Sequence, residues 1–367
     1  MIKYYSDEQI LISTILILCG FGIIAMYSAS SIYAMNNFGN HMFFLIQQLK
    51  WLSIGIFLMF IASKINFQLF KKYAYPILFL SWAIMILGYF FKGENPAARW
   101  LIIGGQSWLT TSDFGKLSLI IFTAFFIDKN KKSIQDLKFM LTKYFPFLGV
   151  SLLLILFQPD TSTTITVSII ILIMLFTSSV SLNFLLSISS IGLIGLIIKI
   201  IHTPHAISRL LNWNDTQKIQ SLNAFGTGGI FGSGLGESII KNGYLPQDHT
   251  DFILPIIGEE LGFVGILLIF LFFCFFYFRG MKIMKKAPDL FSMLLCLGII
   301  SSIIIYFLIN AAYSVGLAPT TGLPMPFISY GGSHTIFTLI SIGILINICT
   351  KGNAGINKSY RGSSYGL

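Results

Sequence analysis

The sequence predicts an all-α polytopic membrane protein with about ten transmembrane helices. Of its 367 residues, 55% are hydrophobic and only 10% are charged, whereas a soluble domain carries about 25% charged residues. The mean hydropathy is +0.80. The apolar runs are spread evenly along the chain, which favours one integral membrane domain over residues 1–350 and a short cytoplasmic tail over 351–367.

The first apolar run, residues 10–35, predicts a spanning helix. It is too long for the apolar core of a signal peptide, and Asp7 and Glu8 offset the charge of Lys3. About 20 apolar residues cross a bilayer. The fourth to sixth of the ten candidate spans are short. Nine further spans are predicted, at residues 43–63, 73–91, 114–128, 145–158, 163–178, 182–201, 252–278, 290–317 and 334–350.

The basic residues are distributed unevenly among the predicted loops. Sixteen of the 24 lysines and arginines lie in one set of loops, and five lie in the opposite set. The positive-inside rule therefore predicts that both termini are cytoplasmic. The net charge of +10 is explained as a topology signal, and nucleic-acid binding is not needed to account for it.

This orientation places three segments of unusual composition outside the cell: residues 92–113, 202–251 and 318–333. The large extracytoplasmic loop between spans 7 and 8 has about 50 residues, and loops of that length are usually functional or disordered. No internal repeat is evident, so the inverted repeats of many secondary transporters are missing.

The sequence predicts no metal or nucleotide site. The four cysteines lie in apolar runs without ligand spacing, and "HTPH" (202–205) offers only two histidines. The segment "AFGTGGIFGSGLGES" (224–238) contains neither a dinucleotide-binding nor a P-loop pattern. Its glycines indicate either a turn-rich connection or a backbone cradle for phosphate.

The segment "NPAARWLIIGGQSWLTTSDFGK" (95–116) places charged residues at the outer face of the membrane that the chain spans. Arg99 and Trp100 lie between two spans, and Asp113 and Lys116 open the fourth. Asp113 and Lys116 are three residues apart, so they share a helix face. One interpretation is a local ion pair beside an interfacial tryptophan. The other is a cationic pocket for an anionic headgroup.

Asp160 lies in "QPDTSTT" (158–164), between the fifth and sixth spans. Pro159 ends the first of these spans, and an aspartate followed by serine and threonine is typical of a helix N-cap. A substrate contact is the alternative interpretation for Asp160.

The segment "YLPQDHTDFILPIIGEELGFVG" (244–265) carries acids into the eighth span, where a carboxylate costs about 2.5–3.5 kcal/mol at the helix centre. Asp251 lies at the mouth of this span, two residues after His249, and either Thr250 or Asp251 is an alternative candidate for the helix N-cap. Pro255 cannot donate to the carbonyl of Asp251, which loosens the first turn. Glu260 lies about 13 Å further along an ideal helix, so we interpret it as a structural buried acid that pairs with a cation from another span.

The segment "GLAPTTGLPMPFISYGGSH" (316–334) contains too many prolines and glycines for a continuous membrane helix. Such backbone is tolerated at membrane depth only where it is buried in protein or lines a cavity. Ser329, Tyr330 and Ser333 are therefore expected to face a cavity. His334 is interpreted as a helix-start residue.

At these residues the sequence resembles the SEDS family of bacterial peptidoglycan polymerases, named for shape, elongation, division and sporulation. The most specific pieces are "YLPQDHTDFILPIIGEELGF", "GLPMPFISYGGS" and "AARWLIIGG". The resemblance extends from the first span to about Thr350. It is strongest to the division branch, FtsW, with the elongation branch, RodA, as the alternative.

The resemblance implies a lipid II glycosyltransferase of the bacterial cytoplasmic membrane. It makes Asp251 the catalytic carboxylate and matches Arg99, Trp100 and Lys116 to residues of the family. The further substrate-binding candidates are Asp113, Asp160, His249, Ser329 and Gly331. "TTSD" (110–113) replaces the usual Gln-Pro-Ser-Glu, and "SYGGSH" replaces "SYGGSS", so the roles of Asp113 and His334 stay open.

The implied reaction joins a sugar hydroxyl to an anomeric carbon while undecaprenyl diphosphate leaves. A carboxylate serves as general base, and cations stabilise the diphosphate. The implied partners are a class B penicillin-binding transpeptidase and other divisome membrane proteins. The participation of a divalent cation, Mg²⁺ or Mn²⁺, stays open. Two alternatives of other classes are a lipid II flippase and a non-catalytic scaffold.

Overall fold

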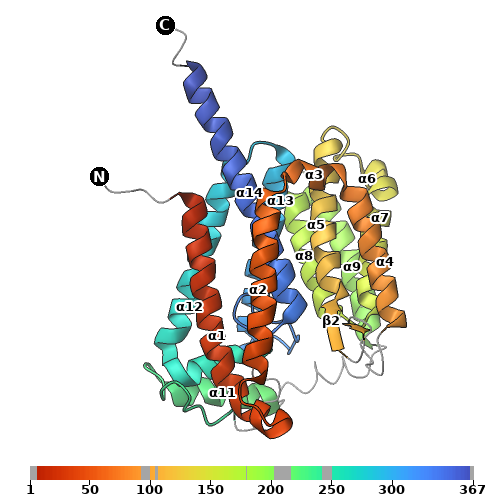
Figure 1. Cartoon of the computed structure of the whole chain (residues 1–367). Coiled ribbons are helices and arrows are strands. Elements are labelled where there is room, and N and C mark those ends of the chain that lie inside the picture. Colours follow the sequence, from red (N-terminus) through yellow and green to blue (C-terminus); the bar gives the residue numbers. More distant parts are fainter. Residues whose placement is uncertain are drawn as a thin grey trace.

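The computed structural model describes residues 6–91, 100–103, 106–178, 180–201, 216–241 and 250–363. These residues form a helical bundle with one small antiparallel hairpin (Figure 1). Ten helices correspond to the ten predicted spans: α1 (Asp7–Phe38), α2 (Phe43–Lys64), α4 (Ala74–Phe90), α5 (Thr111–Lys129), α7 (Phe145–Phe157), α8 (Thr161–Thr177), α9 (Leu182–Ile201), α12 (Ile253–Lys285), α13 (Leu290–Ser314) and α14 (Gly332–Ser363).

Five helices of the described chain are long and apolar enough to cross a membrane: α1, α2, α12, α13 and α14. A sixth candidate combines α7 with the short helix α6 (Leu137–Lys143), with a bend of 46° between them. Helices α4 and α8 are apolar but shorter. The structure therefore shows a multi-helix membrane protein, and the count of ten spans stays a prediction.

Several short elements were not predicted. They are α3 (Phe67–Lys72), α6, α11 (Thr216–Gly228) and the two strands β1 (Trp100–Ile103) and β2 (Gln106–Thr110). Trp100 pairs with Thr110 in the hairpin register. The hairpin leads directly into α5, so it fixes the position at which that helix begins. The predicted break within 316–334 is present, because residues 315–331 contain no helix or strand.

The two ends of the bundle differ. The start of α1 and the end of α14 lie at one end together with α3 and α6, and β2 and α11 lie at the opposite end (Figure 1). Asp7 at the start of α1 pairs with Lys286, at 2.6 Å, and with Lys282, at 3.0 Å, near the end of α12. Helix α14 continues through residue 350 without interruption, and the proposed domain boundary at that residue stays a prediction.

Helix α12 is interrupted at Gly262, whose backbone has φ 66° and ψ −164°. Only glycine adopts this conformation readily. The glycine-rich segment after α11 fills the interruption: the amide of Ser233 donates to the carbonyl of Glu259 at 2.9 Å, and Phe263 donates to Gly229 at 2.9 Å. The segment 229–241 consists of turns and bends, as the turn-rich interpretation predicted, and these hydrogen bonds tie it to α12.

Candidate functional site

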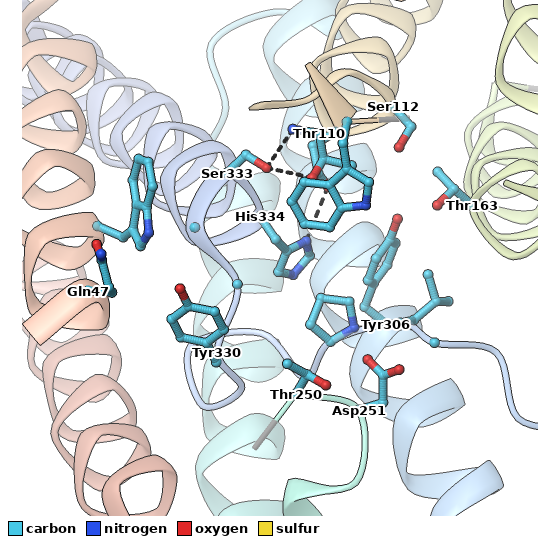
Figure 2. A pocket seen from close by; sticks show the side chains of 18 of the residues that line it. Gln47, Thr110, Ser112, Thr163, Thr250, Asp251, Tyr306, Tyr330, Ser333 and His334 are labelled. Carbon is cyan, nitrogen blue, oxygen red and sulfur yellow. Dashed lines mark hydrogen bonds and ion pairs between the residues drawn. The ribbon is translucent and has the colours of Figure 1, made fainter. Parts of the chain in front are cut away.

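A polar cavity of about 590 Å³ lies among the first turns of several helices (Figure 2). Its lining combines carboxylates, hydroxyl groups and aromatic rings, which is the composition expected of a site for a polar ligand with apolar faces. The lining residues are Phe38, Phe43, Gln47, Trp51, Trp100, Thr110, Ser112, Asp113, Asp160, Thr163, Thr250, Asp251, Tyr306, Gly322, Leu323, Pro324, Tyr330, Gly331, Gly332, Ser333 and His334.

Asp251 lies on the cavity wall beside Thr250, across from Thr110, Ser112 and Ser333 (Figure 2). Helix α12 begins at Ile253 and Phe252 occupies its N-cap position, so Asp251 lies one residue before the capping position. Gly322 approaches from the facing loop with φ 67°, and a Cβ on it would lie 3.4 Å from Oδ2 of Asp251. The loop therefore leaves little space beside this carboxylate for a larger residue.

The backbone of Asp251 is held by two buried side chains of α13. Pro255 has no N–H with which to bond the Asp251 carbonyl. The Tyr313 hydroxyl contacts that carbonyl at 2.7 Å, and the Asn310 amide donates to it at 3.0 Å. The same two groups lie 3.0 and 2.9 Å from the carbonyl of Leu323. We call Asn310 and Tyr313 the α13 clamp, because they tie Asp251 to the loop opposite it.

A second cluster of polar and aromatic side chains lies where α5 and α14 begin. Lys116 Nζ lies 3.4 Å from Asp113 Oδ1 and 4.1 Å from the centre of the Tyr306 ring. The same Asp113 oxygen lies 3.2 Å from Nδ1 of His334. The His334 and Tyr306 rings stack, with centroids 5.2 Å apart. Asp113, His334 and Tyr306 line the cavity, and Lys116 lies behind them.

Asp160 forms the N-cap of α8, where it accepts a hydrogen bond from the amide of Thr163 at 3.1 Å. It also accepts a hydrogen bond from Ser112 at 2.9 Å. The cap interpretation therefore describes its local geometry, and the residue lines the cavity as well.

The structure brings most of the predicted site residues together. Trp100 and Gly331 line the cavity, as do Tyr330 and Ser333. Burial raises the pKa of Tyr330, and a hydrogen bond with Trp51 offsets this in part, so its hydroxyl stays protonated. Ser329 lies behind this wall, where its hydroxyl accepts a hydrogen bond from the amide of Met325 at 2.9 Å. Arg99 and His249 lie outside the described residues.

Glu260 and Glu259 lie away from the cavity and are fully buried. Glu260 pairs with Lys241 at 3.0 Å and accepts a hydrogen bond from Ser28 at 2.6 Å. The cation thus comes from the segment after α11, whereas a cation from another span was expected. Glu259 accepts hydrogen bonds from the amide of Ile239, at 3.1 Å, and from the hydroxyl of Ser238. Both acids hold the glycine-rich segment in place.

Four residues of the site were not singled out by motif: Tyr306, Asn310, Tyr313 and, as a cavity residue, His334. Asn310 gave the clearest signal, because an amide within an apolar run needs a buried partner. His334 stood out only because "SYGGSH" replaces the "SYGGSS" of the family that the sequence resembles. The aromatic residues gave no signal, because aromatic residues make up 15% of the chain and no single one stands out.

A lateral groove of about 810 Å³ lies between α12 and α13, next to α11. Its lining is almost entirely apolar and includes Phe225, Leu254, Phe263, Phe270 and Leu308. Leu254 is three residues from Asp251, so one end of the groove lies within a helical turn of the carboxylate.

Comparison with known proteins identifies the family. The profile of the cell cycle protein family that comprises FtsW, RodA and SpoVE matches residues 9–354. The chain belongs to this family. It is 37% identical to the probable peptidoglycan glycosyltransferase FtsW of Trichlorobacter lovleyi, over 93% of this chain and 92% of that protein. It is 34% identical to stage V sporulation protein E of Bacillus subtilis, over 94% and 98%.

The fold of the family is also confirmed. A chain in a solved peptidoglycan synthase complex that coordinates polymerisation and crosslinking matches with a TM-score of 0.75 at 20% identity, over 96% of this chain and 99% of that one. At this identity the match supports the fold alone. Within the described residues, no group of three or more histidine, cysteine or acidic side chains is arranged to hold a metal ion, and a role of Mg²⁺ or Mn²⁺ stays a hypothesis.

Proposed function

We propose that this chain is a peptidoglycan glycosyltransferase that polymerises lipid II at the outer face of the cytoplasmic membrane during cell division. The observation that carries the proposal is the position of Asp251, a carboxylate on the wall of a polar cavity in a member of the FtsW, RodA and SpoVE family. Its relatives of the division branch, named probable peptidoglycan glycosyltransferase FtsW, support the assignment.

In the proposed reaction, Asp251 accepts the proton of the attacking 4-hydroxyl group while the oxygen of that hydroxyl group bonds to the anomeric carbon. The bond from that carbon to the diphosphate oxygen breaks, and undecaprenyl diphosphate leaves with the bonding electrons. A single displacement inverts the anomeric configuration, so a second carboxylate at the short distance of retaining enzymes is not required.

The leaving diphosphate requires positive charge. Arg99, which precedes Trp100 in the sequence, is proposed to supply this positive charge. Lys116 is proposed to act through Asp113 and Tyr306, because it contacts both and lies behind the cavity wall. The apolar groove between α12 and α13 is proposed to hold a polyprenyl tail, since it begins one turn from Asp251.

We also propose ten spans, cytoplasmic termini and an extracytoplasmic loop between the seventh and eighth spans. The start of α1 and the end of α14 lie at the same end of the bundle, which supports this topology (Figure 1). A reporter fused after residue 363 is expected to be active only in the cytoplasm of the host cell. Activity of that fusion in the periplasm would contradict the proposed topology.

A class B penicillin-binding transpeptidase and other divisome membrane proteins are the proposed partners. The match to a chain from a synthase complex that coordinates polymerisation and crosslinking is compatible with a transpeptidase partner. Copurification of the two chains from bacterial membranes tests this part of the proposal, and their separation under mild detergent would count against it.

The function is tested by incubating the purified protein with lipid II, alone and with the transpeptidase. The wild-type chain is expected to form glycan strands. Asp251→Asn is expected to fold but to polymerise about 10²–10⁴-fold more slowly, because asparagine accepts no proton at neutral pH. Asp136→Asn is the matched control, since Asp136 caps the distant helix α6. Normal strands from Asp251→Asn would favour a non-catalytic scaffold.

A further inference from the structure

His334 lines the cavity and carries a buried nitrogen without a hydrogen-bond partner among the described residues. The residue is 7% exposed. Its Nδ1 lies 3.2 Å from Asp113, whereas among the described residues its buried Nε2 has no hydrogen-bond partner. Leaving a buried polar atom unpaired costs about 1–3 kcal/mol, so an orphaned atom at a cavity indicates a place for a ligand.

The surroundings define the chemistry of Nε2. An ionised carboxylate accepts hydrogen bonds and donates none. Asp113 therefore accepts a hydrogen bond from the Nδ1–H of a neutral imidazole, which leaves a lone pair on Nε2. Lys116 contacts the same Asp113 oxygen at 3.4 Å, and the Tyr306 ring stacks on the imidazole. The tautomer and the orientation of the ring are both set by contacts within the protein.

A lone pair requires a donor from the ligand. Lipid II offers hydroxyl and acetamido N–H groups on its sugars, whereas an ionised diphosphate offers only acceptors. We propose that Nε2 of His334 accepts a hydrogen bond from a sugar donor of lipid II, so that the His334, Asp113 and Tyr306 wall is a sugar subsite. This inference rests on the proposed function, because it takes lipid II as the substrate.

The wall has the parts that such a subsite needs. Trp51, Trp100 and Tyr330 line the same cavity as His334 and supply apolar ring faces. Figure 2 places His334 between Ser333 and Thr110 on one side and Thr250 and Asp251 on the other. A sugar bound against His334 would therefore lie in the cavity that also contains the proposed base.

Two substitutions separate the nitrogens of His334. Asparagine keeps a short amide donor for Asp113 but does not reach the position of Nε2. Glutamine extends an amide to about the position of Nε2. His334→Asn is expected to weaken the binding of lipid II roughly three- to tenfold, the effect of one lost neutral hydrogen bond. His334→Gln is expected to recover part of this loss. Ser341→Ala, two turns along α14, is the control.

Binding is measured in nanodiscs by titration with lipid II, in an Asp251→Asn background that prevents turnover. A second titration uses undecaprenyl diphosphate, which lacks the sugars. The proposal expects His334→Asn to weaken only the binding of lipid II. Equal weakening for both lipids would assign His334 to the diphosphate, and no weakening for either would remove it from the site; both results overturn the proposal.

The polymerisation assay tests the proposed function, and the binding measurement tests the sugar subsite, so either hypothesis can be rejected without the other. If the wild-type chain formed no strands, the proposed function would fail, and the lipid II titration would still report on His334. If strands formed and His334→Asn bound lipid II normally, the function would stand and the sugar subsite would be rejected.

Discussion

Asp251 and the pair Glu259 and Glu260 lie within nine residues of each other at the start of α12, yet their surroundings differ. The two glutamates are fully buried: Glu259 accepts hydrogen bonds from Ser238 and Ile239, and Glu260 pairs with Lys241 and accepts a hydrogen bond from Ser28. Asp251 lines a cavity, and side chains of α13 hold its backbone carbonyl. The difference teaches that acids enclosed by hydrogen-bond donors stabilise this bundle, whereas the proposed chemistry belongs to the acid on the cavity wall.

The largest effect on stability is expected from Glu260→Ala. It removes the partner of Lys241, whose ammonium group is buried, and breaking a buried ion pair costs about 3–5 kcal/mol. The free energy of unfolding in detergent should fall by that amount. The polymerisation rate per folded molecule should be largely retained, and a loss as deep as that of Asp251→Asn would erase the distinction between the acids.

A smaller loss of stability is expected from Gly262→Ala. The backbone of Gly262 lies in a region that costs other residues about 1–3 kcal/mol, and a Cβ would lie 2.4 Å from the amide nitrogen of Gly232. Unfolding measurements should show the loss. Gly20→Ala is the matched control, because nothing lies within 4 Å of its added Cβ. Equal stability of the two variants would mean that the glycine-rich segment does not lock α12.

The smallest expected effect tests the α13 clamp. Tyr313→Phe removes the hydroxyl that lies 2.7 Å from the Asp251 carbonyl. The loss of this hydrogen bond should lower the free energy of unfolding by about 0.5–1.5 kcal/mol. If this contact positions the base, kcat should fall about two- to tenfold while KM stays near its wild-type value. Tyr277→Phe, at an exposed position of α12, should leave kcat unchanged. A change confined to KM would assign Tyr313 to substrate binding.

The helices that form the bundle could be predicted because the bilayer imposes their length and apolarity. All ten predicted spans coincide with helices, from α1 to α14. The short helix α11 and the β1–β2 hairpin could not be predicted this way. These elements are short, and α11 is polar, so length and apolarity do not mark them in the sequence. Helix α11 packs against α12, and the hairpin leads into α5.

The candidate site was predictable where charge stands out in an apolar chain. Asp251, Asp113 and Asp160 were found by this signal, and all three line the cavity. The position of Lys116 behind the wall could not be predicted, because helical spacing places it beside Asp113 without saying which face meets the cavity. Asn310 stands out as an amide within an apolar run, but the contacts of Asn310 and Tyr313 with the backbone carbonyls of Asp251 and Leu323 leave no pattern in the sequence.

The central claim is that Asp251 performs chemistry and that Glu260 stabilises the fold. It is tested most directly by the initial rate of lipid II polymerisation per folded molecule, measured for Asp251→Asn and Glu260→Gln in the same assay. The account predicts a loss of about 10²–10⁴-fold for Asp251→Asn and a rate near that of the wild type for Glu260→Gln. Equal rates for the two variants would contradict it.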